Sequence, residues 1–179
     1  MFSATFLRMP LDPKKRDGLK EIDQDFLRIT DEHGWHVMSV APLAGDEGDL
    51  WSYSTGLYYH FEHPEIIVLN EPTDLRLSMI NAIGDRIKAG EKFEPGKGYS
   101  DIIGGNYDVQ FPPVHASHYW DWVNFACWFY DNDETSFPLL QCFYPDMAGK
   151  FPWESGCEQW AIDSQPLLDQ PTKKRRQKT

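Results

Sequence analysis

Four consecutive aliphatic residues constrain the fold of this chain more than any other feature of its sequence. The run is Ile66-Ile67-Val68-Leu69, inside the segment 65–70. Successive side chains of a β-strand point to opposite faces of the sheet, so an unbroken apolar run is typical of a strand that is buried on both faces. We therefore expect such a strand here.

The residues before this run predict one helix and two strands. Apolar residues recur at helical spacing within residues 17–33, and Gly34 is suited to a left-handed cap at the end of that helix. Two β-rich segments follow at 35–41 and 50–57, separated by a loop that contains two glycines and three acidic residues. We expect these two strands to pair as a hairpin.

The residues after the run alternate between helices and strands. Thr73 is placed to cap a helix that ends at Gly90, and Ser117 to cap a nearly all-apolar, buried helix that reaches residue 130. Between these helices, the segments 99–103 and 107–111 flank a Gly-Gly-Asn turn and predict another hairpin. A last strand is expected at 137–144.

These elements predict an α+β protein with a mixed, mostly antiparallel sheet of about five to six strands packed with three helices. A chain of 179 residues can bury one hydrophobic core without a disulfide or metal. We expect a single globular domain at 17–170, an N-terminal extension at 1–16 and a basic, disordered tail at 171–179.

The charge of the chain is uneven. The net charge is −11, yet the C-terminal tail holds five of the 17 basic residues, which leaves 12 basic against 28 acidic residues in the rest of the chain. Such a body repels nucleic acid and favours a basic partner, unless the charge serves only solubility. Candidate binding residues are the acidic clusters Asp46, Glu47 and Asp49, and Asp131, Asp133 and Glu134.

Cysteine content and hydropathy indicate a cytoplasmic protein. The three cysteines are odd in number and have no C-x-x-C spacing, so we expect reduced thiols, with Cys127 and Cys142 as small buried side chains rather than nucleophiles. The N-terminus lacks the pattern of a secretory signal, and no apolar run approaches the roughly 20 residues of a membrane span. No membrane partner is expected.

All six histidines fall into pairs of the same spacing: His33 and His36, His60 and His63, His115 and His118. Two residues at this spacing share a face only in a helix. The first pair spans the end of the first helix and the next strand, so its side chains are expected to diverge, and Pro64 makes convergence of the second pair doubtful.

His115 and His118 flank the predicted cap Ser117 and are the strongest site candidates. His63 or Glu65, at the start of a neighbouring strand, would complete a zinc site with an open position for water. Glu65 is also a candidate catalytic residue beside the two histidines. Three alternatives remain for these residues: a structural role, a metal-free binding or catalytic role, and metal binding.

An ordered series of short motifs resembles a known family. The motifs are His33-Gly34-Trp35, Tyr53-Ser54-Thr55-Gly56-Leu57, His63-Pro64-Glu65, Pro113-Val114-His115 with His118-Tyr119, Pro145-Asp146, Phe151-Pro152-Trp153 and Gln165-Pro166. They resemble small, mostly bacterial proteins grouped as domain of unknown function 4262, over about residues 31–168. The resemblance implies a fold, and it points to His33, His63, His115 and His118, without implying a reaction.

Two functions are compatible with these observations. The first is a non-catalytic acidic binding protein of the immunity or antitoxin kind, which docks on a basic partner such as a nuclease-type toxin. The second is a small histidine-dependent hydrolase or other enzyme, with or without a metal, that uses His115 and His118 with His63 or Glu65. The acidic body and the lack of a recognised catalytic motif favour the first.

Overall fold

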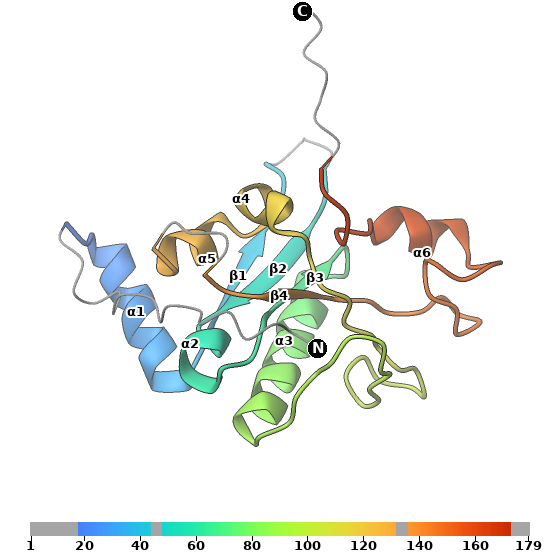
Figure 1. Cartoon of the computed structure of the whole chain (residues 1–179), viewed down its shortest axis with the longest axis horizontal. Coiled ribbons are helices and arrows are strands. Elements are labelled where there is room, and N and C mark those ends of the chain that lie inside the picture. Colours follow the sequence, from blue (N-terminus) through green and yellow to red (C-terminus); the bar gives the residue numbers. More distant parts are fainter. Residues whose placement is uncertain (1–17, 44–47, 132–135, 173–179) are drawn as a thin grey trace, which may run out of the picture.

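A four-stranded sheet lies at the centre of the structure, a computed structural model that describes residues 18–43, 48–131 and 136–172. The strands, in their spatial order, are β1 (His36–Val40), β2 (Trp51–Thr55), β3 (Glu65–Leu69) and β4 (Leu139–Cys142) (Figure 1). β1 with β2 and β2 with β3 are antiparallel, whereas β3 and β4 are parallel. The expected α+β class and mixed sheet are therefore confirmed.

The two edge strands of this sheet have different neighbours. β4 is flanked by the segment 110–114, through single antiparallel bridges from Gln110 to Phe143 and from Pro113 to Leu140. β1 is the other edge strand, and among the described residues it has a neighbouring strand on one side only.

β3 is buried at all five positions, as its aliphatic run predicts. Ile67 and Leu69 pack into the apolar cluster on one face of the sheet, and Ile66 and Val68 pack into the cluster on the other face. The alternation of side chains along the strand thus divides the core into two layers with β3 between them.

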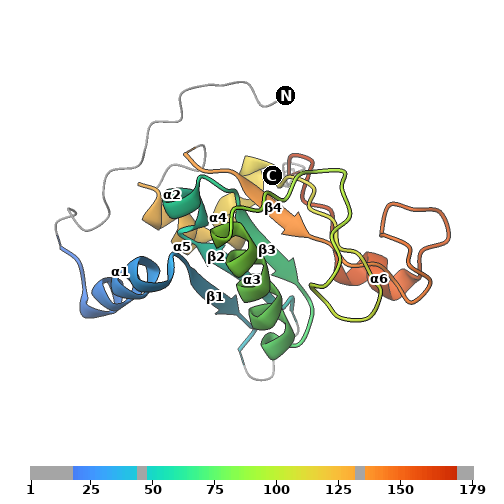
Figure 2. The same cartoon turned by 90° about the horizontal axis from the view of Figure 1, so that it is seen from below.

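Helices cover both faces of the sheet (Figures 1 and 2). Six α-helices lie in the described residues, together with the 3₁₀-helix η2 (Ala116–His118): α1 (Glu21–His33), α2 (Leu57–Phe61), α3 (Thr73–Lys88), α4 (Tyr119–Trp122), α5 (Asn124–Phe129) and α6 (Gln159–Ser164). α3 packs its aliphatic stripe on one face, and α1, α4 and α5 pack on the other. None of these helices is long and apolar enough to cross a membrane.

The expected number of strands is too high because the segment 99–111 is not a regular hairpin. Tyr99 and Val109 form one antiparallel bridge. Three residues between them have a positive φ, namely Asp101, Gly104 and Gly105. A backbone that turns through left-handed conformations leaves the extended path, so only one residue pair stays in register. β4 is also shorter than the predicted segment 137–144.

The expected number of helices is too low, partly because the predicted helix at 117–130 is interrupted. Val123 has a non-helical conformation, with φ −137° and ψ 42°, and it separates α4 from α5. The Trp51 indole of β2 donates a hydrogen bond of 2.7 Å to the carbonyl of Trp122. This tertiary contact competes with the helical bond that the carbonyl would otherwise accept from Ala126. α2 and α6 were not predicted as helices.

Glycine is required at two positions in the helical layers. Gly34 ends α1 in the left-handed region with φ 98°, which confirms the predicted cap. Gly84 lies under Trp35, where a Cβ atom would approach the indole ring to 2.5 Å. No disulfide joins the three cysteines, all of which lie in the described residues, and Cys127 and Cys142 are buried as expected.

Candidate functional site

Glu65 begins β3 and is fully buried. Its Oε1 atom accepts hydrogen bonds from the backbone N–H of Gly56 at 2.8 Å and of Tyr58 at 3.1 Å, and from the hydroxyl of Tyr130. Its Oε2 atom accepts a bond of 2.5 Å from Ser54. Four donors from β2, α2 and the end of α5 therefore converge on this one carboxyl group.

The electrostatics of Glu65 follow from this arrangement. Burial raises the pKa of the Glu65 carboxyl above its ordinary value, and the four donors oppose that rise because they favour the ionised form. Burial also raises the pKa of the Tyr130 hydroxyl, which lies against the carboxyl group. Both oxygens of Glu65 are engaged inside the core, which is the arrangement of a structural crosslink between segments distant in sequence.

His63 is buried, with both ring nitrogens hydrogen-bonded. Nδ1–H donates to the carbonyl of Pro64 at 2.8 Å, and Nε2 accepts from the backbone N–H of Phe93 at 3.0 Å. A carbonyl only accepts and an N–H only donates, so these partners fix the tautomer. Burial lowers the pKa of His63. The ring is therefore a neutral support for the segment at Phe93.

His115 and His118 hold the C-terminal segment. The Nδ1 atom of His115 accepts from the Ser117 N–H at 3.2 Å, so His115 and not Ser117 caps η2. The Ser117 hydroxyl instead accepts from the N–H of Thr172 at 2.9 Å. His118 donates through Nε2 to the carbonyl of Gln170 at 2.8 Å.

No hydrogen bond joins the candidate residues Glu65, His63, His115 and His118 to one another among the described residues. The hydrogen bonds of Glu65 and His63 go to core backbone and side chains, and those of His115 and His118 go to η2 and to residues 168–172. The described part of the chain has no group of three or more His, Cys, Asp or Glu side chains placed to hold a metal ion. Zinc binding by His63, His115 and His118 stays a prediction.

The predicted acidic clusters are only partly described. Asp49 and Asp131 are exposed, and Asp49 accepts a bond of 3.1 Å from Asn70. Asp46, Glu47, Asp133 and Glu134 lie outside the described residues.

A polar pocket that the sequence did not predict opens between α1, β1 and α3. Its volume is about 440 Å³, and its polar walls include His33 of α1, His36 of β1, and Asn81, Asp85 and Lys88 of α3. The two histidines were expected to diverge, but both line this pocket. The i, i+4 and i+7 spacing of the α3 residues, which places them on one helical face, was the available signal.

Buried polar residues also lie in two other places, and neither was assigned a role from the sequence. Arg76, at the start of α3, donates to Ser52 Oγ at 3.0 Å and to Thr73 Oγ1 at 3.1 Å, although its place in an amphipathic helix predicts exposure. Asp146 accepts backbone bonds of 2.9 Å from Ala148, Lys150 and Glu158. These bonds lower the pKa of Asp146, and they organise the loop that precedes α6.

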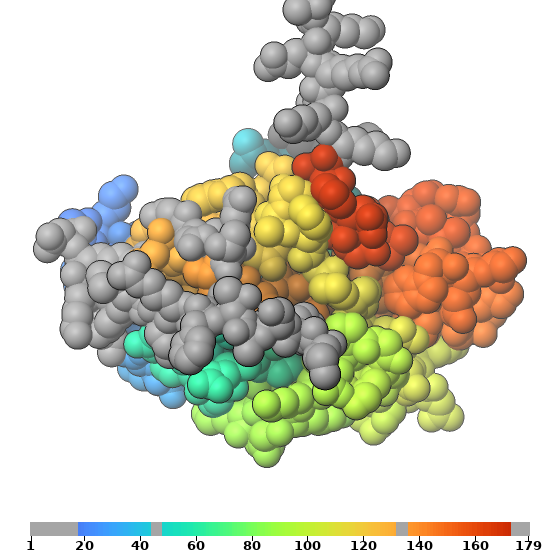
Figure 3. Space-filling view, viewed as in Figure 1, coloured from blue at the N-terminus to red at the C-terminus, as the bar shows by residue number. Residues whose placement is uncertain are grey.

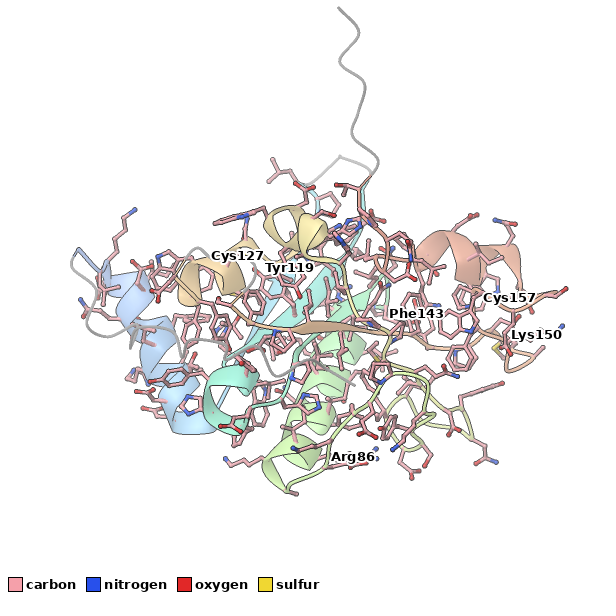
Figure 4. The ribbon with its side chains drawn as sticks, viewed as in Figure 1. Arg86, Tyr119, Cys127, Phe143, Lys150 and Cys157 are labelled. Carbon is pink, nitrogen blue, oxygen red and sulfur yellow. The ribbon has the colours of Figure 1, made fainter. Side chains whose placement is uncertain are left out.

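The segment 146–164 lies at one end of the molecule, opposite α1, and appears in orange and red in Figures 2 and 3. Lys150 and Cys157 are neighbours in this segment (Figure 4). The Cys157 thiol donates a hydrogen bond of 3.4 Å to the Lys150 carbonyl. Trp153 and Trp160 are 43% and 45% exposed in this segment. Large aromatic side chains are thus presented to solvent from the loop held by Asp146 and from α6, which follows it.

The fold defines a class: an α+β domain with a four-stranded mixed sheet between two helical layers. Comparison with protein families assigns residues 29–158 to the domain of unknown function DUF4262. The chain therefore belongs to the DUF4262 family, as the ordered motifs predict. Neither the curated proteins nor the solved structures gave a match.

Proposed function

We propose that this protein is a non-catalytic acidic binding protein, of the immunity or antitoxin kind, that docks on a basic protein partner in the cytoplasm. The observation that carries the proposal is a group of exposed tryptophan and acidic side chains in the segment 146–169, here called the tryptophan patch. The patch consists of Trp153, Glu154, Glu158, Trp160 and Asp163, all of which are exposed. The absence of a disulfide among the three cysteines, all of which are described, is compatible with a reducing compartment.

The tryptophans of the patch are held in place by their neighbours. Trp153 stacks on Phe151, with ring centroids 5.0 Å apart and planes within 6°, and meets Phe143 edge-on at 5.2 Å. Trp160 donates from its indole N–H to Glu158 at 2.6 Å. Pre-ordered tryptophans lose little entropy on association and are enriched among the residues that dominate binding energy.

The charge of the patch supports a basic partner. Lys150 is the single basic residue between Asp146 and Asp169, whereas that segment contains five acidic residues. Lys150 is engaged with the carbonyls of Ser155 and Gly156. A negative field around two exposed indoles would steer a basic surface to the patch and weaken as salt rises.

The hydrolase alternative lacks a comparable supporting observation. Both oxygens of Glu65 and both nitrogens of His63 are occupied by partners in the core, the Nδ1 atom of His115 caps η2, and His118 binds the C-terminal segment. Catalysis by Glu65, His63 or His118 would require those bonds to break.

Co-expression with a toxic, basic product of a neighbouring gene tests the proposal. The full chain should restore growth, and the purified pair should bind about tenfold or more weakly when the salt concentration is raised from roughly 0.05 to 0.5 M. Trp160→Ala and Glu158→Lys should each weaken binding by about tenfold or more, as expected for hot-spot positions.

Asp25→Lys is the matched control for Glu158→Lys, because it makes the same charge change on an exposed position of α1, at the opposite end of the molecule. It should leave binding nearly unchanged. Failure of every neighbouring product to be neutralised would contradict the proposal. An affinity indifferent to salt and to both patch variants would do the same.

A further inference from the structure

The pocket between α1, β1 and α3 has walls of opposite charge. Asp85 and Lys88 both line it from α3, and neither makes an ion pair with another described residue. Lys88 donates through Nζ to the carbonyl of His33 at 3.2 Å, which places the ammonium group at the end of α1 and leaves two N–H donors. One carboxylate and one ammonium group are therefore available in a single cavity.

Neutral groups of the pocket also retain hydrogen-bonding capacity. The Asn81 Oδ1 atom accepts from the Trp35 indole at 3.1 Å, which orients the amide and leaves its N–H₂ group as a donor. The His36 Nδ1 atom is buried without a hydrogen-bond partner in the described residues. Leaving a buried polar atom unpaired is costly, so it is a position where a ligand group would be favoured.

Apolar side chains complete the lining. Ile29 of α1 and Val37 of β1 contribute aliphatic surface beside the polar groups. The Phe26 ring packs against His36 with centroids 4.5 Å apart, which supports the imidazole from the side of the core. The pocket, at about 440 Å³, lies within the size range of small-molecule sites.

We propose that this pocket binds a small zwitterion of the free amino-acid type, with an aliphatic side chain. The carboxylate of the ligand pairs with Lys88 and the Asn81 amide, and its ammonium group pairs with Asp85. The aliphatic side chain lies against Ile29 and Val37. His36 and His33 line the same cavity and complete its polar wall. This site is separate from the tryptophan patch, so the two proposals stand or fall independently.

Titration of the ¹⁵N-labelled full chain with L-valine tests the assignment, with N-acetyl-L-valine and L-valinamide as analogues that each lack one charge. L-valine should shift the indole signal of Trp35, the ring nitrogens of His36 and the amides of residues 81–88. Each analogue should bind about tenfold or more weakly, since each loses a charge-assisted hydrogen bond.

Two variants assign the charges to residues. Lys88→Met should remove the preference for L-valine over L-valinamide, and Asp85→Asn should remove the preference over N-acetyl-L-valine. Lys92→Met and Asp74→Asn alter exposed charges outside the pocket and should bind as the unaltered chain does.

Three results would overturn the proposal. One is the absence of shifts with L-valine and with every other aliphatic amino acid. Another is an equal affinity of the unaltered chain for L-valine and for the charge-blocked analogues. This measurement does not depend on whether any variant folds. The third is unchanged preference in both pocket variants.

Discussion

The side chain of Glu65 links four segments of the fold. Its contribution to stability depends on the individual hydrogen bonds that it accepts. Ser54 donates to Glu65 and also accepts a bond of 2.9 Å from the N–H of Ile66. The Tyr130 hydroxyl donates to Glu65 and accepts a bond of 3.2 Å from Tyr59. Each group thus has a defined donor or acceptor role, and a change of one role leaves another group unpaired.

Glu65→Gln tests this crosslink. The amide oxygen can keep the donors of Oε1, but the amide N–H₂ then faces Ser54, whose hydroxyl proton loses its acceptor. We expect the free energy of unfolding to fall by about 1–3 kcal/mol, the cost of an unsatisfied buried group. Urea denaturation measures it. Glu62→Gln, at an exposed position nearby, is the control, and an equal effect of both changes would argue against the crosslink.

His63 makes stability depend on pH. Burial holds its pKa in the folded state below the value of about 6.5 in an unfolded chain, so the unfolded state binds the proton first as pH falls. The free energy of unfolding should therefore decrease below about pH 6.5 and level off below the folded-state pKa. Burial also lowers the pKa of His36.

Denaturation curves at several pH values in this range measure the effect. In His63→Gln the side-chain oxygen can still accept from Phe93 but does not titrate, so the acid-dependent loss should be smaller. Identical pH profiles for the variant and the unaltered chain would show that His63 does not contribute.

The elements show where sequence periodicity is sufficient and where it is not. The presence of α1, β3 and α3 follows from local signals: a helical stripe, an aliphatic run and a glycine cap. Two of their starts differ from the prediction, because α1 begins at Glu21 rather than at residue 17, and Pro72 rather than Thr73 is the N-cap of α3. The break at Val123 depends on the Trp51 indole, 71 residues from Trp122 in sequence, and no local pattern encodes that contact. The missed helices α2 and α6 have only five and six residues, too short to show a full apolar stripe.

Gly84→Ala tests the packing of α3 on Trp35. A Cβ atom at this position would lie 2.5 Å from the Trp35 ring, so the helix or the indole must move. Alanine favours helix by about 1 kcal/mol over glycine, but overpacking costs about 1–3 kcal/mol, so we expect a net loss of stability. Thermal unfolding followed by tryptophan fluorescence measures the change.

Ser78→Ala is the matched control, because Ser78 is exposed on the same helix. It should change stability little. A Gly84→Ala protein as stable as the control would show that α3 does not approach the sheet as closely as described.

Across the whole molecule, the sequence predicted the class and family better than the site. The ordered motifs contain Ser54, His63, Glu65, Asp146 and Gln165, and in the structure these are buried hydrogen-bonding residues. A motif records that a residue type matters but not whether it faces a ligand or the core. Residue spacing places Asn81, Asp85 and Lys88 on one face of α3, but tertiary packing decides that α1 and β1 lie against that face.

The unpaired edge of β1 is expected to affect how the protein behaves at high concentration. Its outer backbone N–H and C=O groups have no strand partner among the described residues, so this edge can pair with a strand from a second chain. At high concentration, aggregation should begin there. A lysine substituted for Ser39, the exposed residue of this strand, would be the first change to try when the protein precipitates.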